Sequence, residues 1–442
     1  MNSPVISISQ RPPQSVTDIL LAASVHSSSS ILFAEEPTEV VTEDGLRHAD
    51  LRLHARHYKQ ASFAERLLQC LRSLKVPTWL SPEITPQDIR IFKVSGSLTN
   101  AVFFVSSSLH EPRTVLLRIY GPSSGSLISR TRELHTLHIL SSQYHIGPRV
   151  YGTFENGRVE EYFHSTVLTA SDLRDPKISR WVGARMAELH SVDIEAVEDT
   201  SPANRGEGKG WEIGVKKNVK SWIHPARDVL ALPIVSENLR VEFDLDGFKR
   251  DWDVYMQWLA SVDDVKCGSR RVYAHNDTQY GNLLLLNKPN ENLPEHRQLI
   301  VVDFEYASPN PASYDIANHF HEWTANYHST TPHILDPSRY PTKEERANFY
   351  LAYLEHSTLS PDSRPLPKLE LLGLIPDLEK QVRAWSPASH ACWAIWGIVQ
   401  ARDDLENDVQ EPEFDYIAYA LCRMAAFRRE LKQLGLKGLS FE

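Results

Sequence analysis

The stretch that decides the fold is "VYAHNDTQYGNLLLL" at 272–286, which has a companion in "LIVVDFEYA" at 299–307. In both, a short apolar run typical of a strand adjoins acidic and amide side chains. Two such strands separated by a loop form a hairpin, which would gather Asp277, Asn282 and Asp303 around one point. An acid that orients and deprotonates a hydroxyl, an amide oxygen and a second carboxylate for Mg²⁺ are what phosphoryl transfer requires.

Structural explanations compete with this interpretation. An aspartate at a strand end is most often a turn or cap residue. Here that explanation would have to apply separately to Asp277, Asn282 and Asp303, which occur in the order that a kinase requires. His319 and His321 suggest a metal site, yet residues two apart on a helix point in different directions. We therefore expect both histidines to be structural, and Asp315 to brace the catalytic loop.

Length and composition exclude several classes of protein. A chain of 442 residues fits two or three domains or one bilobal enzyme. With 47 basic and 57 acidic residues the net charge is −10, which disfavours general nucleic-acid binding. The four cysteines are scattered, which argues against a zinc site or a disulfide scaffold. Without a bilayer-length apolar run or a secretory signal, we expect a cytoplasmic protein with no stable membrane insertion.

Composition along the chain predicts a tail and two lobes. Residues 1–42 are rich in Ser and Pro and look disordered, 43–164 form a β-rich lobe, and 165–442 form a large, mainly helical lobe. The fold class is therefore α+β and bilobal. In the first lobe we expect a helical pattern at about 43–74, strands at 89–92, 102–105 and 113–121, a helix at 129–147, and a hairpin at 149–163 turning at Asn156–Gly157. In the second lobe we expect helices at 175–192, beginning at Asp175–Pro176, and at 245–262. Two helices have a predicted inward face, formed by Phe63, Leu67, Leu68 and Leu71 in the helix at 43–74 and by Leu134, Leu137 and Leu140 in the helix at 129–147.

Aromatic residues at helical spacing suggest the nature of an acceptor. Trp393 and Trp396 lie three apart on one predicted helix, as do Tyr416 and Tyr419 on another. A quaternary ammonium donates no hydrogen bond and is recognised by aromatic faces in a diffuse negative field. Without further context, such a stripe is more often part of a core than of a binding site.

Longer strings resemble one family. "HNDTQYGN" followed by "VVDFEYASPNPASYDIANHFHEW" is similar to the choline/ethanolamine kinases, most of all to the fungal type, and "DIANHFHE" carries the family signature. The likeness extends over roughly residues 88 to 430. It implies a protein-kinase-like fold, with ATP and Mg²⁺ as cofactors. The HND…N pattern alone is shared with aminoglycoside phosphotransferases.

The resemblance implies roles for the residues around the hairpin. Asp277 would receive the proton of the substrate hydroxyl, and Gln279 would lie beside the reacting alcohol. Asp303 would bind Mg²⁺, Asn282 would be a second metal contact, and Glu305 a further ligand.

For ATP, the resemblance implies a turn that covers the phosphates, a basic clamp and a hinge. Arg118 would clamp phosphates and be held by Glu133, where the alternative is an ordinary surface pair. A turn such as "VSGSLTNAVF" is by itself usually structural, and Ser95 replaces a glycine that is common in the family. The residues assigned to the nucleotide are Gly96, Ser97, Thr99, Asn100, Arg118, Glu133 and, through backbone groups near adenine, Glu161 and Phe163.

For the amine, the resemblance implies an aromatic site with nearby carboxylates. The acidic link "DDLENDVQEPEFDYIAY" is longer than usual in the family, so the Trp pair is placed more firmly than the Tyr pair. The residues assigned to the substrate are Asp277, Gln279, Glu305, Tyr306, Glu322, Tyr327, Trp393, Trp396, Tyr416 and Tyr419.

The function predicted on this basis is ATP-dependent phosphorylation of choline to phosphocholine, the first step of phosphatidylcholine synthesis by family analogy. Ethanolamine kinase is the alternative, because the motifs serve both substrates. A pseudokinase that binds nucleotide or choline without turnover and an aminoglycoside phosphotransferase are weaker options. Because family members commonly dimerise, a homodimer is a candidate assembly.

Overall fold

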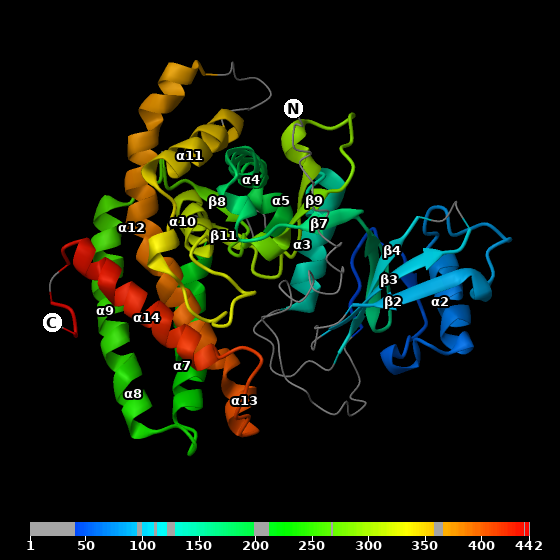
Figure 1. Ribbon diagram of the computed structural model, residues 1–442, viewed down its shortest axis with the longest axis horizontal. Helices are drawn as coiled ribbons and strands as arrows, with labels where there is room; N and C mark the ends of the chain where they lie inside the picture. The colour runs from blue at the N-terminus through cyan, green and yellow to red at the C-terminus, as the bar shows by residue number, and fades with distance from the viewer. Residues whose placement is uncertain are drawn as a thin grey trace, which may run out of the picture.

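The structure is a computed structural model (Figure 1). It describes residues 40–94, 100–109, 113–121, 129–198, 212–266, 268–357, 366–436 and 438–441. Apart from its last three residues, the tail predicted at 1–42 lies outside the described residues, so its disorder stays a prediction.

A six-stranded sheet forms one end of the molecule, at the right of Figure 1. Its strands are β1 (His48–Ala49), β2 (Ile89–Lys93), β3 (Asn100–Ser107), β4 (Val115–Tyr120), β5 (Val150–Phe154) and β6 (Gly157–Glu161). They lie in the order β1-β5-β6-β4-β3-β2, and every neighbouring pair is antiparallel except β1 and β5. The predicted strands and the predicted hairpin are confirmed.

The turn of that hairpin lies one residue earlier than predicted. Glu155 and Asn156 form the turn, and Gly157 already pairs with Phe154 as the first residue of β6. A Cβ at Gly157 would lie 2.2 Å from the carbonyl oxygen of Arg118, so the lack of a side chain lets β4 approach closely.

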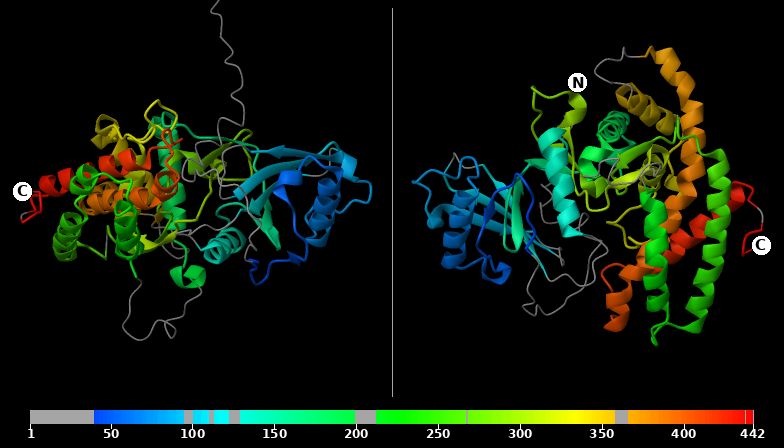
Figure 2. Two further views of the ribbon diagram at one scale, coloured as in Figure 1. Left: turned by 90° about the horizontal axis from the view of Figure 1, so that it is seen from below. Right: turned by 180° about the vertical axis from the view of Figure 1, so that it is seen from behind.

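Helix α2 (Ala61–Ser73) covers the face of the sheet that is turned away from the rest of the molecule (Figures 1 and 2). Its predicted apolar face is confirmed, since Phe63, Leu67, Leu68 and Leu71 are buried against the sheet. The first sheet thus has a core of its own.

Helix α3 (Arg130–Gln143) lies between the sheet and the helical part of the chain (Figures 1 and 2). Ser129 caps its first turn by accepting a hydrogen bond from a backbone N–H. Leu134, Leu137 and Leu140 are inward as predicted, and they belong to the hydrophobic core of the helical part. The helix therefore couples the two parts.

The rest of the chain is mainly helical. Its helices are α4 (Pro176–Leu189), α5 (Ile194–Glu198), α7 (Gly214–Leu230), α8 (Glu237–Phe243), α9 (Leu245–Val262), α10 (Ala312–Glu322), α11 (Lys343–Ser357), α12 (Lys368–Gln400), α13 (Arg402–Glu406) and α14 (Tyr416–Gln433). The helices predicted at 175–192 and 245–262 are confirmed as α4 and α9. The side chain of Asp175 caps α4 by accepting from the backbone N–H groups of Lys177 and Ile178 at 2.8 and 3.0 Å.

Two small sheets line the junction between the sheet and the helices. The first joins β7 (Ser165–Val167), β9 (Leu283–Leu286) and β10 (Leu299–Val301), and the second joins β8 (Arg271–Ala274) and β11 (Ser308–Pro311). Strands β9 and β10 are antiparallel neighbours, which confirms the predicted hairpin.

The fold class is α+β and two-lobed, as predicted. The chain leaves the first sheet at Glu161 and enters the second at Ser165. The predicted lobe boundary at 164/165 lies in this link and stays a prediction. Among the described helices, none combines the length and the apolar character needed to cross a bilayer.

Candidate active site

The β9–β10 hairpin brings the three predicted oxygen-bearing side chains together. Leu283 pairs with Val301, and the N–H of Val302 donates to the carbonyl of Asn282 at 3.0 Å, so Asn282 and Asp303 leave the hairpin side by side. The amide Nδ2 of Asn282 donates to Oδ2 and to the backbone carbonyl of Asp277, both at 2.9 Å. Two loops therefore meet at one point.

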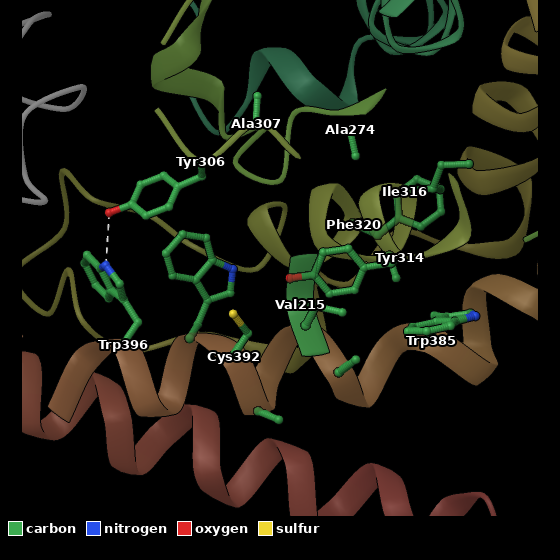
Figure 3. Packing of buried hydrophobic residues seen from close by; sticks show 14 of the residues in the cluster. Val215, Ala274, Tyr306, Ala307, Tyr314, Ile316, Phe320, Trp385, Cys392 and Trp396 are labelled. Atoms are coloured by element: carbon green, nitrogen blue, oxygen red, sulfur yellow. Dashed lines mark hydrogen bonds between the residues drawn. The ribbon is translucent and has the colours of Figure 1, made fainter. Parts of the chain in front are cut away.

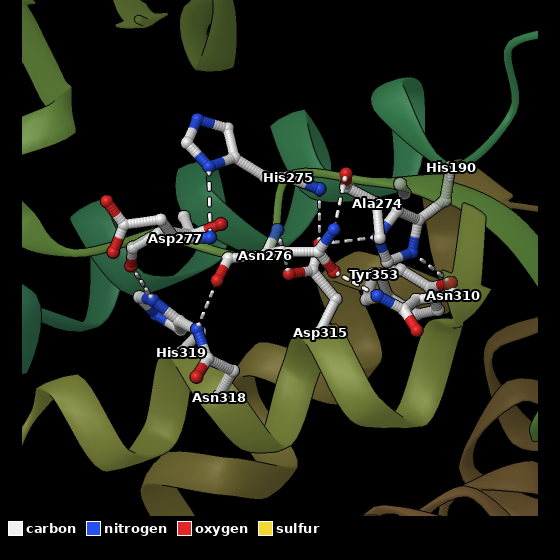
Figure 4. Close-up of polar contacts among 12 residues, drawn as sticks. His190, Ala274, His275, Asn276, Asp277, Asn310, Asp315, Asn318, His319 and Tyr353 are labelled. Atoms are coloured by element: carbon white, nitrogen blue, oxygen red, sulfur yellow. Dashed lines mark hydrogen bonds and ion pairs between the residues drawn. The ribbon is translucent and has the colours of Figure 1, made fainter. Parts of the chain in front are cut away.

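The loop that carries Asp277 is buried and is braced from below by α10 (Figure 4). The carboxylate of Asp315 accepts hydrogen bonds from the backbone N–H groups of His275 and Asn276 at 3.0 and 2.8 Å. Its Oδ2 also lies 2.9 Å from Nε2 of His190. Burial alone would raise the pKa of Asp315, but His190, His275 and the backbone N–H of Asn276 together hold this pKa below its usual value.

Removing this brace should disturb the loop. We expect Asp315→Asn to destabilise the protein by about 3 kcal/mol, because an amide cannot accept all three hydrogen bonds and leaves buried donors unpaired. Thermal unfolding measures the destabilisation and steady-state kinetics the accompanying fall in kcat. Asp246→Asn is the control, since Asp246 pairs with Arg227 on the surface with 77% of its side chain exposed. Equal stability of the two variants would contradict the bracing role.

Backbone strain marks both loops at the site. Asn276 and Asp303 have φ values of +65° and +69°, in the left-handed region that residues other than glycine rarely adopt. Asn and Asp tolerate this region better than most residues. Asn276 is held there by its amide, which donates to the Tyr306 carbonyl at 2.9 Å and to the Ser308 hydroxyl at 2.8 Å. Such strain is typical of functional loops.

The oxygen atoms at this point fit a hard divalent cation. Oδ1 of Asn282 is buried and has no hydrogen-bond partner among the described residues. Burial raises the pKa of Asp303 to about 6, partly opposed by Arg118, and raises the pKa of Glu305 well above its usual value, reinforced by the charge of Asp303. The pKa of Asp277 is also raised well above its usual value, first by burial and then by the charges of Glu322 and Asp303. A cation would relieve this excess of negative charge.

Gln279 carries an unsatisfied donor beside the same loop. Its side chain is fully buried, and its Oε1 accepts from the N–H of Gly281 at 3.1 Å. The amide Nε2 has no partner among the described residues. The family resemblance places Gln279 beside the reacting alcohol.

Arg118, the predicted basic clamp of the first sheet, has a different ion-pair partner from the one predicted. Arg118 pairs with Glu160, Nε to Oε1 at 3.2 Å, and Glu133 pairs with Arg158 at 2.5 Å, so the predicted Arg118–Glu133 pair is wrong. In the sheet, Arg118 lies opposite Arg158, and paired positions share one face, on which Glu160 also projects. Burial lowers the pKa of Arg118, but Glu160, Glu133 and Asp303 together leave it raised. The positive charge of Arg118 therefore interacts with the carboxylate of Asp303 at the candidate site.

Other predicted nucleotide contacts are only partly placed. Gly96, Ser97 and Thr99 lie outside the described residues, and Asn100 is known only as the first residue of β3. The N–H of Glu161 already donates to the Arg149 carbonyl at 2.8 Å, and the carbonyl of Phe163 accepts from the Ser165 hydroxyl at 3.1 Å. The adenine contacts expected near Glu161 and Phe163 stay a prediction.

Five of the predicted aromatic residues lie in contact and are called the aromatic wall here: Tyr306, Trp393, Trp396, Tyr416 and Tyr419. Figure 3 shows Tyr306 and Trp396, which share a hydrogen bond. The Trp393 and Trp396 rings lie 5.2 Å apart at 82°, and the Tyr306 ring lies 5.4 Å from Trp393. Tyr416 and Tyr419 contact Trp396 with centroids at 5.7 and 6.1 Å. Because neighbouring rings stand nearly at right angles, the wall presents aromatic faces in several directions. The Tyr pair, despite the long acidic link, joins the Trp pair.

Glu322 and Tyr327 lie at the edge of this wall with a residue that the sequence interpretation missed, Arg423. Arg423 is fully buried, donates from Nη2 to Oε1 of Glu322 at 2.8 Å, and donates from Nε to the Tyr419 hydroxyl at 3.0 Å. The Tyr327 hydroxyl donates to Oε2 of Glu322 at 2.6 Å. An arginine in the apolar run "YALCRMAAF", four residues after Tyr419, was the available signal.

His319 and His321 both have partners in the protein, and their structural role stays a prediction. His319 contacts the Thr278 carbonyl at 2.8 Å, whereas the His321 ring lies 3.9 Å from the His390 ring. His390 lies 3.6 Å from Glu430, so these groups are close enough for a metal. However, Arg423 can only donate to Nδ1 of His390, at 3.4 Å, which leaves the proton of the neutral ring on Nε2, facing Glu430. In that tautomer, the Nε2 atom of His390 presents a proton rather than a lone pair to Glu430.

The fold and the site together define a class: a protein-kinase-like phosphotransferase, with a β-sheet lobe, a helical lobe and an Asp–Asn–Asp centre between them. Solved structures with this fold include the choline kinase of Cryptosporidium parvum, with a TM-score of 0.63, 24% identity, and coverage of 85% of this chain and 97% of that one. The Plasmodium vivax ethanolamine kinase has a TM-score of 0.62, 21% identity, and coverage of 84% and 96%.

Within that class, the chain belongs to the choline/ethanolamine kinase family, whose model matches residues 91–428. The choline kinase of Schizosaccharomyces pombe is 34% identical over 433 residues, covering 85% of this chain and 90% of the relative. The human choline/ethanolamine kinase is 31% identical over 359 residues, covering 79% and 82%.

Proposed function

We propose that the protein transfers the terminal phosphoryl group of ATP to the hydroxyl of choline, giving phosphocholine and ADP. The observation that carries the proposal is the meeting of Asp277, Asn282 and Asp303 next to an aromatic wall. Kinases need the first set of groups and recognition of a quaternary ammonium needs the second. Family membership and the curated choline kinases among the relatives point the same way.

In this proposal Asp277 orients the choline hydroxyl and accepts its proton. Asn282 fixes the carboxylate by its hydrogen bond to Oδ2 at 2.9 Å, which leaves the other oxygen for the hydroxyl. Burial and the neighbouring carboxylates raise the pKa of Asp277, and a more basic carboxylate accepts a proton more readily. The free Nε2 donor of Gln279 would bond an oxygen atom of the acceptor or of the phosphate.

Asp303, Oδ1 of Asn282 and Glu305 would hold Mg²⁺. When bound, the ion neutralises phosphate charge that develops during transfer. The protein's own part is to keep these oxygens together, by the β9–β10 pairing and by the left-handed turn at Asp303. Arg118, oriented by Glu160, would add positive charge on the nucleotide side.

The role of Arg118 can be tested because its loss should affect the binding of ATP but not that of choline. We expect Arg118→Gln to raise KM for ATP about ten-fold, because a hydrogen bond to a charged group is lost, and to leave KM for choline nearly unchanged. Initial rates at varied ATP and varied choline separate the two constants. Arg90→Gln, an exposed arginine on β2 of the same sheet, is the matched control. Equal changes in both constants would show that Arg118 supports the fold rather than the nucleotide.

Ethanolamine is the second candidate acceptor, since the family includes enzymes for both amines and the human relative is named for both. Release of ADP with Mg²⁺-ATP and a panel of small amino-alcohols and an aminoglycoside distinguishes the alternatives. Choline kinase activity predicts the highest kcat/KM with choline. A folded protein that turns over none of them is a pseudokinase.

The cellular setting is a further part of the proposal. The described cysteines Cys70, Cys392 and Cys422 are unpaired, as thiols in the reducing cytoplasm are. We therefore place the reaction in the cytoplasm. The homodimer suggested by the family resemblance stays a prediction.

A further inference from the structure

The aromatic wall directs its polar atoms toward protein partners. The indole N–H of Trp393 donates to Oδ1 of Asn318 at 2.7 Å, and that of Trp396 to the Tyr306 hydroxyl at 3.0 Å. The Tyr419 hydroxyl accepts from Arg423. The polar edges of these rings are therefore engaged in the protein, so the wall would contact a ligand through its ring faces.

Glu322 lies at the edge of this wall, and both of its oxygens are occupied. Oε1 receives the Arg423 guanidinium at 2.8 Å and Oε2 receives the Tyr327 hydroxyl at 2.6 Å. Glu322 is 2% exposed and Arg423 is fully buried, so water does not compete for these bonds. The ion pair also neutralises the charge of Glu322 within the protein.

The two amines differ in what this arrangement can satisfy. A primary ammonium brings three N–H donors, and each donor that is buried without an acceptor weakens binding. A quaternary ammonium brings none and is bound by aromatic faces in a diffuse negative field, without a hydrogen-bond acceptor. A free oxygen on the carboxylate of Glu322 would favour the primary amine, and here both oxygens of Glu322 are taken.

We propose that Tyr327 and Arg423 determine specificity: by occupying the carboxylate of Glu322, they make the site select quaternary over primary ammonium alcohols. This inference rests on the proposed function and adds the substrate class and the residues that set it. Arg423 acts through Glu322 and is a positioning residue.

A second triad of the same chemistry provides a matched control. Arg346 donates to Glu379 at 2.7 Å, and the Tyr350 hydroxyl donates to Oε2 of Glu379 at 2.7 Å. This triad joins α11 to α12 and contacts none of the wall residues in the described part of the chain. Tyr350→Phe thus removes a buried tyrosine–glutamate bond without touching the site.

The experiment compares kcat/KM for ethanolamine, N-methylethanolamine, N,N-dimethylethanolamine and choline, which carry three, two, one and no N–H donors when protonated. We expect the wild type to improve along the series. Tyr327→Phe keeps the ring and frees Oε2, so the choline-to-ethanolamine ratio should fall about ten-fold, mainly through KM for ethanolamine. Arg423→Gln should act in the same direction, Arg423→Lys should restore the ratio, and Tyr350→Phe should leave it unchanged.

Two results would overturn the inference. An unchanged ratio in an active Tyr327→Phe enzyme overturns it alone, and this variant decides the matter even if Arg423→Gln does not fold. An equal shift in Tyr350→Phe would also overturn it, by tracing the change to general loosening. A wild type that phosphorylates none of the four alcohols would instead remove the proposed function, and the inference with it.

Discussion

Asp277→Asn should lower kcat by about 10³-fold, with KM for choline changed only a few-fold. The amide is the same size as the carboxylate and can keep the contact with Asn282, but it cannot accept the hydroxyl proton. The substitution also removes a buried acidic group whose pKa is raised by burial and by Glu322, so the fold should not suffer. Steady-state kinetics with ATP, metal and choline measure the loss.

Asp251→Asn is the control for this variant. Asp251 is also fully buried, and its carboxylate accepts from the N–H and the hydroxyl of Ser440 at 2.6 and 2.8 Å, remote from the β9–β10 hairpin. We expect it to alter stability and to keep turnover. If Asp277→Asn turned over choline at the wild-type rate, Asp277 would not be the proton acceptor.

Asp303→Asn has the second largest expected effect. Asparagine tolerates the left-handed backbone at this position, where φ is +69°, so the substitution isolates the loss of charge. We expect kcat/KM to fall about 10³-fold, as for other groups that stabilise transition-state charge, and the metal concentration for half-maximal rate to rise. Titration of Mg²⁺ at fixed ATP and choline measures both.

A matched control exists elsewhere in the chain. Asp408 is exposed and also left-handed, with φ of +50°, so Asp408→Asn makes the same change in the same backbone conformation away from the site. Its kinetics should equal those of the wild type. If Asp303→Asn kept the wild-type dependence on metal, the assignment of Asp303 as a metal ligand would fail.

Local signals in the sequence were sufficient for much of the fold and for the core of the site. Asp175 followed by proline predicted the start of α4, because an aspartate cap acts within a few residues. The convergence of Asp277, Asn282 and Asp303 followed from two short strands separated by a loop. In such a hairpin, the chain itself limits how the strands can pair.

Contacts between distant segments were not predictable in this way. The partner of Arg118 depends on the register between β4 and β6, which lie about forty residues apart, and no local pattern reports it. Arg423 reaches Glu322 across 101 positions, and His190 reaches Asp315 across 125. These pairs arise only when α10 packs against its neighbours, so propensity and spacing say nothing about them.

The central claim is that one site, built from Asp277, Asn282 and Asp303, moves phosphoryl from ATP to choline. The most direct measurement is phosphorus NMR of a reaction containing the purified full chain, Mg²⁺, ATP and choline. The account predicts that phosphocholine and ADP appear in equal amounts with the wild type, and that both appear about 10³-fold more slowly with Asp277→Asn. Release of ADP without phosphocholine, or equal phosphocholine from both proteins, would contradict it.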